Sequence, residues 1–202
     1  MALVIGLSGP QGGGKSTLLN GLTTRGIKVD DFKVSREVQS RLGWDTLDRV
    51  QDSAETMKEF QRTVLEVKKE RERFNSGRDD VDLIVVERTF ADIYVYTCLW
   101  ADKLIRSHKW GILEATSFVS EIADECISAQ KVYEANIFLP FMEHVKWESD
   151  PHRATQSDVE FVGKELEIFI ALRNPPDVVR FSVTAESVQD RVDQVHNFIK
   201  TL

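Results

Sequence analysis

The sequence predicts a doubly wound α/β fold, with a five-stranded parallel sheet and helices on both of its faces. Five short apolar segments are bounded by turn or polar residues, and segments with helical periodicity separate them. This alternation is typical of βαβ crossovers, which place successive strands parallel to one another. A glycine-rich stretch also lies between the first apolar segment and the first helical one, a context that favours a phosphate-binding loop.

The elements follow from local patterns along the chain. The first apolar segment lacks a clean alternation, which is typical of a central strand covered on both faces. Capping-box patterns at Asp52 with Glu55 and at Ser157 with Glu160 predict two helix starts. The predicted strands are 2–8, 27–32, 81–86, 135–140 and 178–183. The predicted helices are 16–25, 35–42, 52–74, 90–106, 113–132 and 157–172, with a last helix that opens at Thr184 or Ala185.

Length and composition indicate an ordinary soluble globular protein. The 202 residues predict a single domain, 1–202, in which the polar segment 143–157 forms a small lid. Cys98 and Cys126 match no metal or redox spacing, and no apolar run approaches a membrane span, so we expect a cytoplasmic protein that contacts no membrane. The net charge of −7 argues against a broad nucleic-acid surface, although a local basic site remains compatible with it.

The stretch GPQGGGKST fits the phosphate-loop pattern G-x-x-x-x-G-K-[ST] in full. Glycines let backbone N–H groups turn toward phosphate oxygens, and the helix N-terminus adds a partial positive charge. Lys15 would reach the β- and γ-phosphates of ATP, and Ser16 would bind Mg²⁺. The predicted ATP-binding residues are Gly9, Gln11, Gly12, Gly13, Gly14, Lys15, Ser16 and Thr17.

A phosphate loop does not by itself specify a reaction. The chain has no N-K-x-D guanine motif, which disfavours a GTPase, and it is short for an AAA-type motor. Glu87 and Arg88 come directly after the third predicted strand, and Asp92 follows four residues past Arg88. If that strand lies beside the first, its carboxyl end faces the phosphate loop. An acid there could accept a proton or hold metal-bound water, and the arginine could hold the substrate; a structural Glu–Arg pair is the alternative.

Glu87-Arg88-Thr89 resembles the E-R-S motif of deoxynucleoside kinases and is similar to the D-R-Y of thymidylate kinases. The overall layout resembles more closely the family of small P-loop kinases and ATPases that includes the ribosylnicotinamide kinase domain. That family has an acid-Arg-x-x-x-Asp run after its third strand, found here at 87–92. It also has a strand that ends in proline, found at Pro140, and a lid arginine, which would be Arg153.

The resemblance implies catalytic roles for these residues, with one departure. Glu87 stands where the family more often has Asp, which leaves its role open between base and ligand of metal-bound water. Arg88 and Asp92 would contact the substrate, and Arg153 would cover the transferring phosphoryl group from the lid.

Three further residues are candidates for substrate binding near the second predicted strand. Asp30 and Asp31 end this strand, where deoxynucleoside kinases carry a carboxylate that acts as the base. A solvated or capping turn is the alternative for two adjacent acids. Arg36 follows closely and could hold the substrate, or it could be a solvated helix residue.

The sequence therefore predicts an ATP- and Mg²⁺-dependent phosphotransferase that acts on a small nucleoside- or nucleotide-like acceptor. One alternative acceptor is a hydroxymethylpyrimidine base within DNA, which a basic patch around Lys131, Lys146 and Arg153 would favour. A second alternative is a nucleotide-gated switch with slow hydrolysis and a protein partner. The sequence names neither the acceptor nor the oligomeric state.

Overall fold

The computed structural model describes residues 1–140 and 155–202, so Arg153 and most of the predicted lid lie outside the described residues. In the described part of the chain, five strands form one parallel sheet in the order β2-β3-β1-β4-β5. This confirms the predicted doubly wound fold. The strands are β1 (Leu3–Ser8), β2 (Val29–Asp30), β3 (Leu83–Glu87), β4 (Ala135–Phe138) and β5 (Val179–Ser182).

Helices connect the strands, and several begin at a residue next to the predicted one. The helix α3 is capped by Ser53 with Thr56 instead of Asp52 with Glu55, and α6 by Thr155 with Asp158 instead of Ser157 with Glu160. The α-helices are α1 (Lys15–Thr24), α2 (Val34–Leu42), α3 (Ala54–Ser76), α4 (Phe90–Arg106), α5 (Ile112–Ala129), α6 (Gln156–Arg173) and α7 (Val188–Ile199). The described residues also form the 3₁₀-helices η1 (Leu47–Gln51) and η2 (Gln130–Val132).

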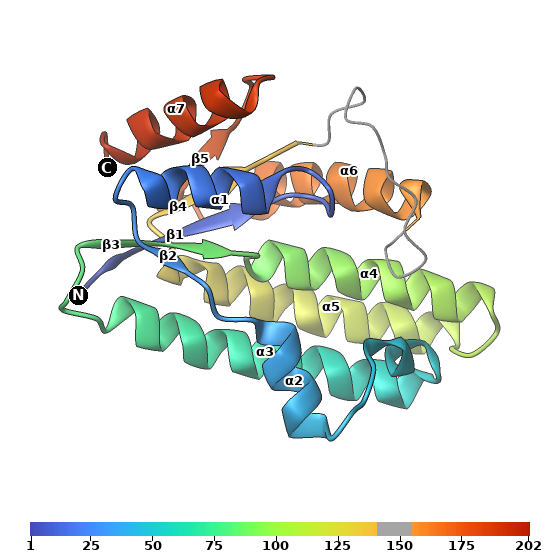
Figure 1. Cartoon of the computed structure of the whole chain (residues 1–202). Helices are drawn as coiled ribbons and strands as arrows, with labels where there is room; N and C mark the ends of the chain where they lie inside the picture. Colours follow the sequence, from blue (N-terminus) through green and yellow to red (C-terminus); the bar gives the residue numbers. More distant parts are fainter. Residues whose placement is uncertain (141–154) are drawn as a thin grey trace.

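The two faces of the sheet carry separate apolar cores. Alternate residues of β1 point to opposite faces, so Ile5 and Leu7 pack with α1 and α7, whereas Val4 packs with residues of α3, α4, α5 and α6. Figure 1 shows α1 and α7 on one side of the sheet and α3, α4 and α5 on the other. Both faces of the central strands are therefore buried, as the continuous apolar run of β1 indicated.

The strand order places the phosphate loop and the end of β3 side by side. In the parallel register Leu7 of β1 pairs with Glu87 of β3, and Asp30 of β2 pairs with Val86. The carboxyl ends of these three strands therefore lie at the same edge of the sheet, where ligands of such sheets bind. Among the described helices, none is both long and apolar enough to cross a membrane.

Candidate active site

The phosphate loop has the backbone conformation that its glycines predicted. Gly12 and Gly14 have φ angles of 78° and 85°, in the left-handed region that glycine adopts without strain. A side chain at Gly13 would place its Cβ 3.1 Å from the carbonyl oxygen of Pro10. The loop is thus a tight backbone turn that ends at the N-terminus of α1, and its N–H groups suit a phosphate chain. Ser16 and Thr17 are exposed in the first turn of α1.

The side chain of Lys15 folds back over this loop. Its Nζ donates hydrogen bonds to the carbonyl oxygens of Gly9, at 2.6 Å, and Pro10, at 2.8 Å, and the residue is only 6% exposed. The pKa of Lys15 is lowered to about 8, mainly by burial and then by the nearby charge of Arg88, while Asp92 and Glu87 partly offset this by raising it. Lys15 is therefore coupled electrostatically to the residues that follow β3. Phosphate oxygens would replace the two carbonyls as its partners.

Arg88 has a strained backbone at the end of β3. Its φ of 60° is left-handed, and within residues 1–140 and 155–202 His108 is the one other non-glycine residue with a positive φ. Such a conformation costs about 1–3 kcal/mol and is found preferentially at functional sites. The Arg88 amide donates to the carbonyl oxygen of Leu7 at 2.9 Å, which ties it to β1 just before the phosphate loop. Its guanidinium carbon lies 4.8 Å from the ring centre of Tyr96 in α4.

Asp92 belongs to the buried N-terminal cap of α4, and its hydrogen bond with Ser8 connects this helix to the residue before the phosphate loop. Its Oδ2 accepts from the Ser8 hydroxyl and from the Thr89 amide, both at 2.8 Å, and the residue is 1% exposed. The Ser8 and Thr89 hydroxyls lie 2.7 Å apart. The other oxygen, Oδ1, is buried without a hydrogen-bond partner in the described structure. These are the contacts of a helix cap, and substrate contact by Asp92 stays a prediction.

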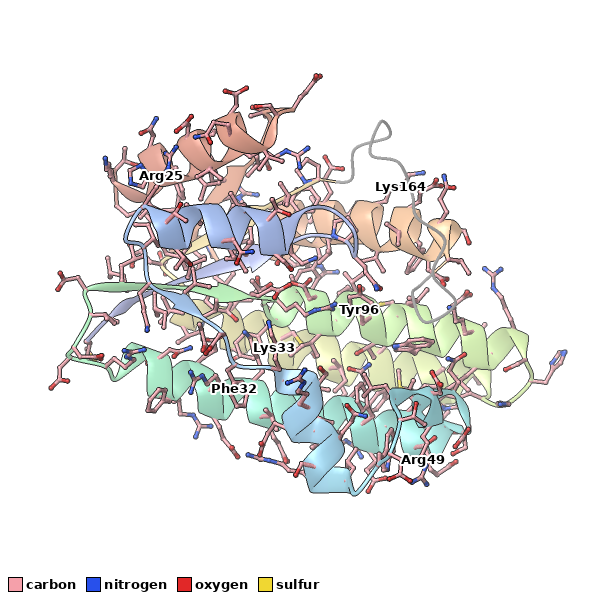
Figure 2. The ribbon with its side chains drawn as sticks, in the orientation of Figure 1. Arg25, Phe32, Lys33, Arg49, Tyr96 and Lys164 are labelled. Atoms are coloured by element: carbon pink, nitrogen blue, oxygen red, sulfur yellow. The ribbon has the colours of Figure 1, made fainter. Side chains whose placement is uncertain are left out.

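Glu87 is held from two sides by lysines. Its Oε2 lies 3.6 Å from Nζ of Lys33, whose side chain is 56% exposed, in the turn before α2. Its carbonyl oxygen accepts from Nζ of the buried Lys68 in α3 at 3.3 Å, and Lys68 also pairs with buried Glu72 at 2.5 Å. Figure 2 labels Lys33, just before α2, and Tyr96 in α4. The end of β3 thus combines one carboxylate with an exposed lysine and a buried one.

Asp30 and Asp31 have different environments although they are adjacent. Asp30 binds the guanidinium of Arg71 through both oxygens, at 2.6 and 2.9 Å, and also accepts from the Asn75 side chain and the Phe32 amide. Burial alone would raise the pKa of Asp30, but these hydrogen bonds hold it at about 2. A carboxylate so fully bonded is a poor base. Asp31 is exposed and keeps the candidate role, as does exposed Arg36.

The phosphate loop suits a nucleoside triphosphate, whereas fewer residues are placed to bind Mg²⁺. The left-handed glycines carry no side chains that would obstruct the loop, and Lys15 supplies the cation. No group of three or more His, Cys, Asp or Glu residues is arranged to hold a metal in the part of the chain that the structure describes. Mg²⁺ in nucleotide sites commonly takes one or two protein ligands besides phosphates and water. Ser16 and Glu87 therefore stay the predicted contributors.

The family comparison agrees with this architecture. A family model described as an AAA domain matches residues 4–191. The chain belongs to that family. A comparison with curated proteins found no match. The family name and the phosphate loop together place this AAA-domain chain in the P-loop superfamily, in agreement with the resemblance stated from sequence.

Solved structures of the same fold include deoxyadenosine kinase from M. mycoides. Its structure with bound dATP matches with a TM-score of 0.70 and 14% identity, over 98% of this chain and 100% of that one. Its structure with the products dCMP and a flexible dCDP matches with a TM-score of 0.67 and 14% identity, over 99% and 100% of the two chains. At this identity the match shows the fold, which is that of P-loop nucleoside kinases.

Several residues of this site carried no signal in the sequence. Lys33 and Lys68 reach Glu87 from segments 54 and 19 residues away, and Arg71 reaches Asp30 across 41 residues. Lys68 and Arg71 belong to a charged helix tail, which the sequence favours as a solvated surface. Only a predicted placement of α3 under the ends of β2 and β3 would have revealed them.

Proposed function

We propose that this AAA-domain protein is a kinase that transfers the γ-phosphoryl group of Mg·ATP to a hydroxyl group of a nucleoside- or nucleotide-like acceptor. The observation that carries the proposal is the position of Glu87 and Arg88. Glu87 ends the strand that pairs with β1, and Arg88 follows it. The Arg88 amide donates a hydrogen bond to the carbonyl oxygen of Leu7, just before Ser8 and the phosphate loop. A carboxylate and a guanidinium thus lie next to the loop, on the side where an acceptor would meet the donor phosphates. The fold of nucleoside kinases supports the same reaction.

The roles follow from charge and position. Lys15 and the loop N–H groups hold the β- and γ-phosphates, and Mg²⁺, bound by Ser16, would neutralise their charge. The carboxylate of Glu87 or Asp31 accepts the proton of the acceptor hydroxyl as its oxygen attacks phosphorus. Arg88 holds the acceptor through its fork of N–H donors. Arg153 of the predicted lid, outside the described residues, would cover the transferring group. Because phosphoryl transfer needs little covalent chemistry from the protein, positioning and charge supply most of the catalysis.

The DNA-directed alternative has less support in the described residues. Of the basic patch that would favour it, Lys131 lies in η2 before the amino end of β4. Because the strands are parallel, this is the edge of the sheet away from the phosphate loop. Lys146 and Arg153 lie outside the described residues.

ADP release from Mg·ATP against an acceptor panel tests the proposal. The panel contains nucleosides, deoxynucleotides, ribosylnicotinamide, and DNA with and without hydroxymethylpyrimidines. We expect a small nucleoside or nucleotide to raise ADP release well above the basal rate, and Lys15→Ala to abolish the stimulation. Stimulation by modified DNA alone would instead support the DNA-directed kinase. Tight ATP binding with no stimulating acceptor would overturn the kinase and favour the nucleotide-gated switch.

A further inference from the structure

We propose that Arg191 of α7 binds the phosphate groups of the donor nucleotide, as a second cation beside Lys15. The inference rests on the nucleotide site of the proposed function and extends it to a helix at the far end of the chain. The ligand class is a nucleoside di- or triphosphate.

Arg191 lies against the phosphate loop. It is in the first turn of α7, it is only 6% exposed, and its Nη1 is 3.3 Å from the point where a side chain at Gly14 would begin. Gly14 immediately precedes Lys15 and is the N-cap of α1. A guanidinium nitrogen is therefore held at the turn whose backbone N–H groups are proposed to bind phosphate.

The position of the guanidinium is fixed by its surroundings. Its Nε donates to the carbonyl oxygen of Ala185 at 3.0 Å, in the segment between β5 and α7. The helix α7 also packs directly on α1, since a Cβ at Gly21 would lie 2.4 Å from a methyl group of Val192. A cation held by packing and backbone contacts needs little reorganisation when a ligand arrives.

The chemistry of the group suits an oligophosphate better than a purely structural role. Guanidinium is always charged and carries five N–H donors in a planar fork that matches phosphate oxygens. The loop already provides N–H donors and the positive end of α1, which attract an anion but do not neutralise it. Gly14 then has two functions, because it adopts the left-handed turn and leaves room for the guanidinium.

The chain contains a matched control. Arg25 also joins α1 to α7, through an ion pair with Asp193, but it follows the carboxyl end of α1. Figure 2 shows Arg25 at the end of α1 away from the phosphate loop. If Arg191 only anchored α7, replacing either arginine should have similar consequences.

The test is the equilibrium Kd of Mg·ADP for the wild type, Arg191→Gln, Arg191→Lys and Arg25→Gln, with thermal unfolding measured on each. We expect Arg191→Gln to weaken Mg·ADP binding by about tenfold or more, the loss that follows from removing a charged hydrogen bond. Arg191→Lys should give an intermediate loss, because it keeps the charge without the fork. Arg25→Gln should lower the Tm and leave the Kd within about twofold, since a partly exposed ion pair contributes to stability only.

If Arg191→Gln lowers the Tm but leaves the Kd for Mg·ADP unchanged, Arg191 only stabilises the fold. That result would overturn the inference and leave the proposed function intact. If Arg191→Gln does not fold, Arg191→Lys decides in the same way: a weakened Kd supports the inference and an unchanged one overturns it. If the wild type binds Mg·ADP but no acceptor stimulates ADP release, the kinase proposal fails and the role of Arg191 is still decided by the variants. A wild type that binds no Mg·ADP overturns both.

Discussion

The donor side and the acceptor side of this site are built in different ways. The donor side is mainly backbone: one continuous turn, Gly9 to Gly14, with left-handed glycines and the lysine that follows it. The proposed acceptor side is mainly side chains, which come from the turn before α2, from α3, from the end of β3 and from α4, and meet only in the folded protein. A backbone site can be recognised from a short local pattern, whereas a side-chain site depends on which distant elements become neighbours.

The largest effect is expected from the carboxylate that accepts the acceptor's proton. If that group is Asp31, Asp31→Asn should lower kcat by about 10²–10⁴-fold, the usual contribution of general-base catalysis, and leave stability unchanged because the residue is exposed. Glu87→Gln should then have a smaller effect. Steady-state kinetics on both variants decides between them, and a large kcat loss in Glu87→Gln alone would assign the base to Glu87.

Asp30→Asn is the matched control, since it should change stability and not the chemistry. The bonded Asp30 has its pKa lowered from 3.8 to about 2, which corresponds to about 2 kcal/mol of folding free energy. For a carboxylate with a depressed pKa, this stability is present above about pH 4 and is lost as the pH falls toward 2. Urea unfolding of Asp30→Asn near neutral pH should therefore show a loss of that size, with kcat nearly unchanged. A kcat loss as large as that of Asp31→Asn would assign Asp30 a direct role.

Asp30 and Asp31 also show which features of the site could not be predicted from the sequence. The fold class and the phosphate loop follow from apolar segments and one specific motif, whereas the neighbourhood of the first and third strands enters the sequence argument only as a condition. Asp30 and Asp31 are indistinguishable in the sequence, because the sequence does not say where the strand ends or which of the two carboxylates meets Arg71. The predicted caps of α3 and α6 are wrong by one and two residues, because each start offers two capping residues close together, Asp52 and Ser53 in one case and Thr155 and Ser157 in the other.

Replacement of Arg88 should affect acceptor binding and backbone strain in opposite ways. Arg88→Gly removes the acceptor-binding cation and also the steric cost of a left-handed φ. We expect kcat/KM for the acceptor to fall by about 10²-fold, the effect of losing a charge-assisted bidentate contact. The free energy of unfolding should stay equal or rise by up to about 1 kcal/mol, because glycine adopts this conformation readily.

His108→Gly separates these two effects. His108 has a φ of 58° and is exposed after the end of α4, so its replacement removes the same kind of strain away from the site. We expect a similar change in unfolding free energy, measured by urea denaturation, and unchanged kinetics. A clear loss of stability in Arg88→Gly but not in His108→Gly would mean that Arg88 is a structural residue held by Tyr96 rather than a strained functional one.

The smallest predicted effect concerns the donor side and is a pH dependence. The ligand-free protein has a Lys15 pKa of about 8, lowered from 10.5 mainly by burial. Because the unfolded chain binds more protons than the folded one between these values, the stability of the ligand-free protein should rise with pH from about 8 to 10.5. A phosphate ligand favours the charged form, so the pKa of Lys15 in the complex lies higher than 8. ADP binding above pH 8 must then take up a proton.

The affinity for ADP should accordingly fall by up to about tenfold per pH unit above pH 8 and stay nearly constant between pH 7 and 8. Titration calorimetry in two buffers of different ionisation enthalpy would measure both the Kd and the proton uptake. Lys15→Met should bind more weakly and without this pH dependence, because nothing titrates at that position. An equally steep dependence in Lys15→Met would place the titrating group elsewhere. The donor side would then depend on a further side chain besides Lys15 and Arg191, and the difference between the two sides of the site would be smaller than the geometry indicates.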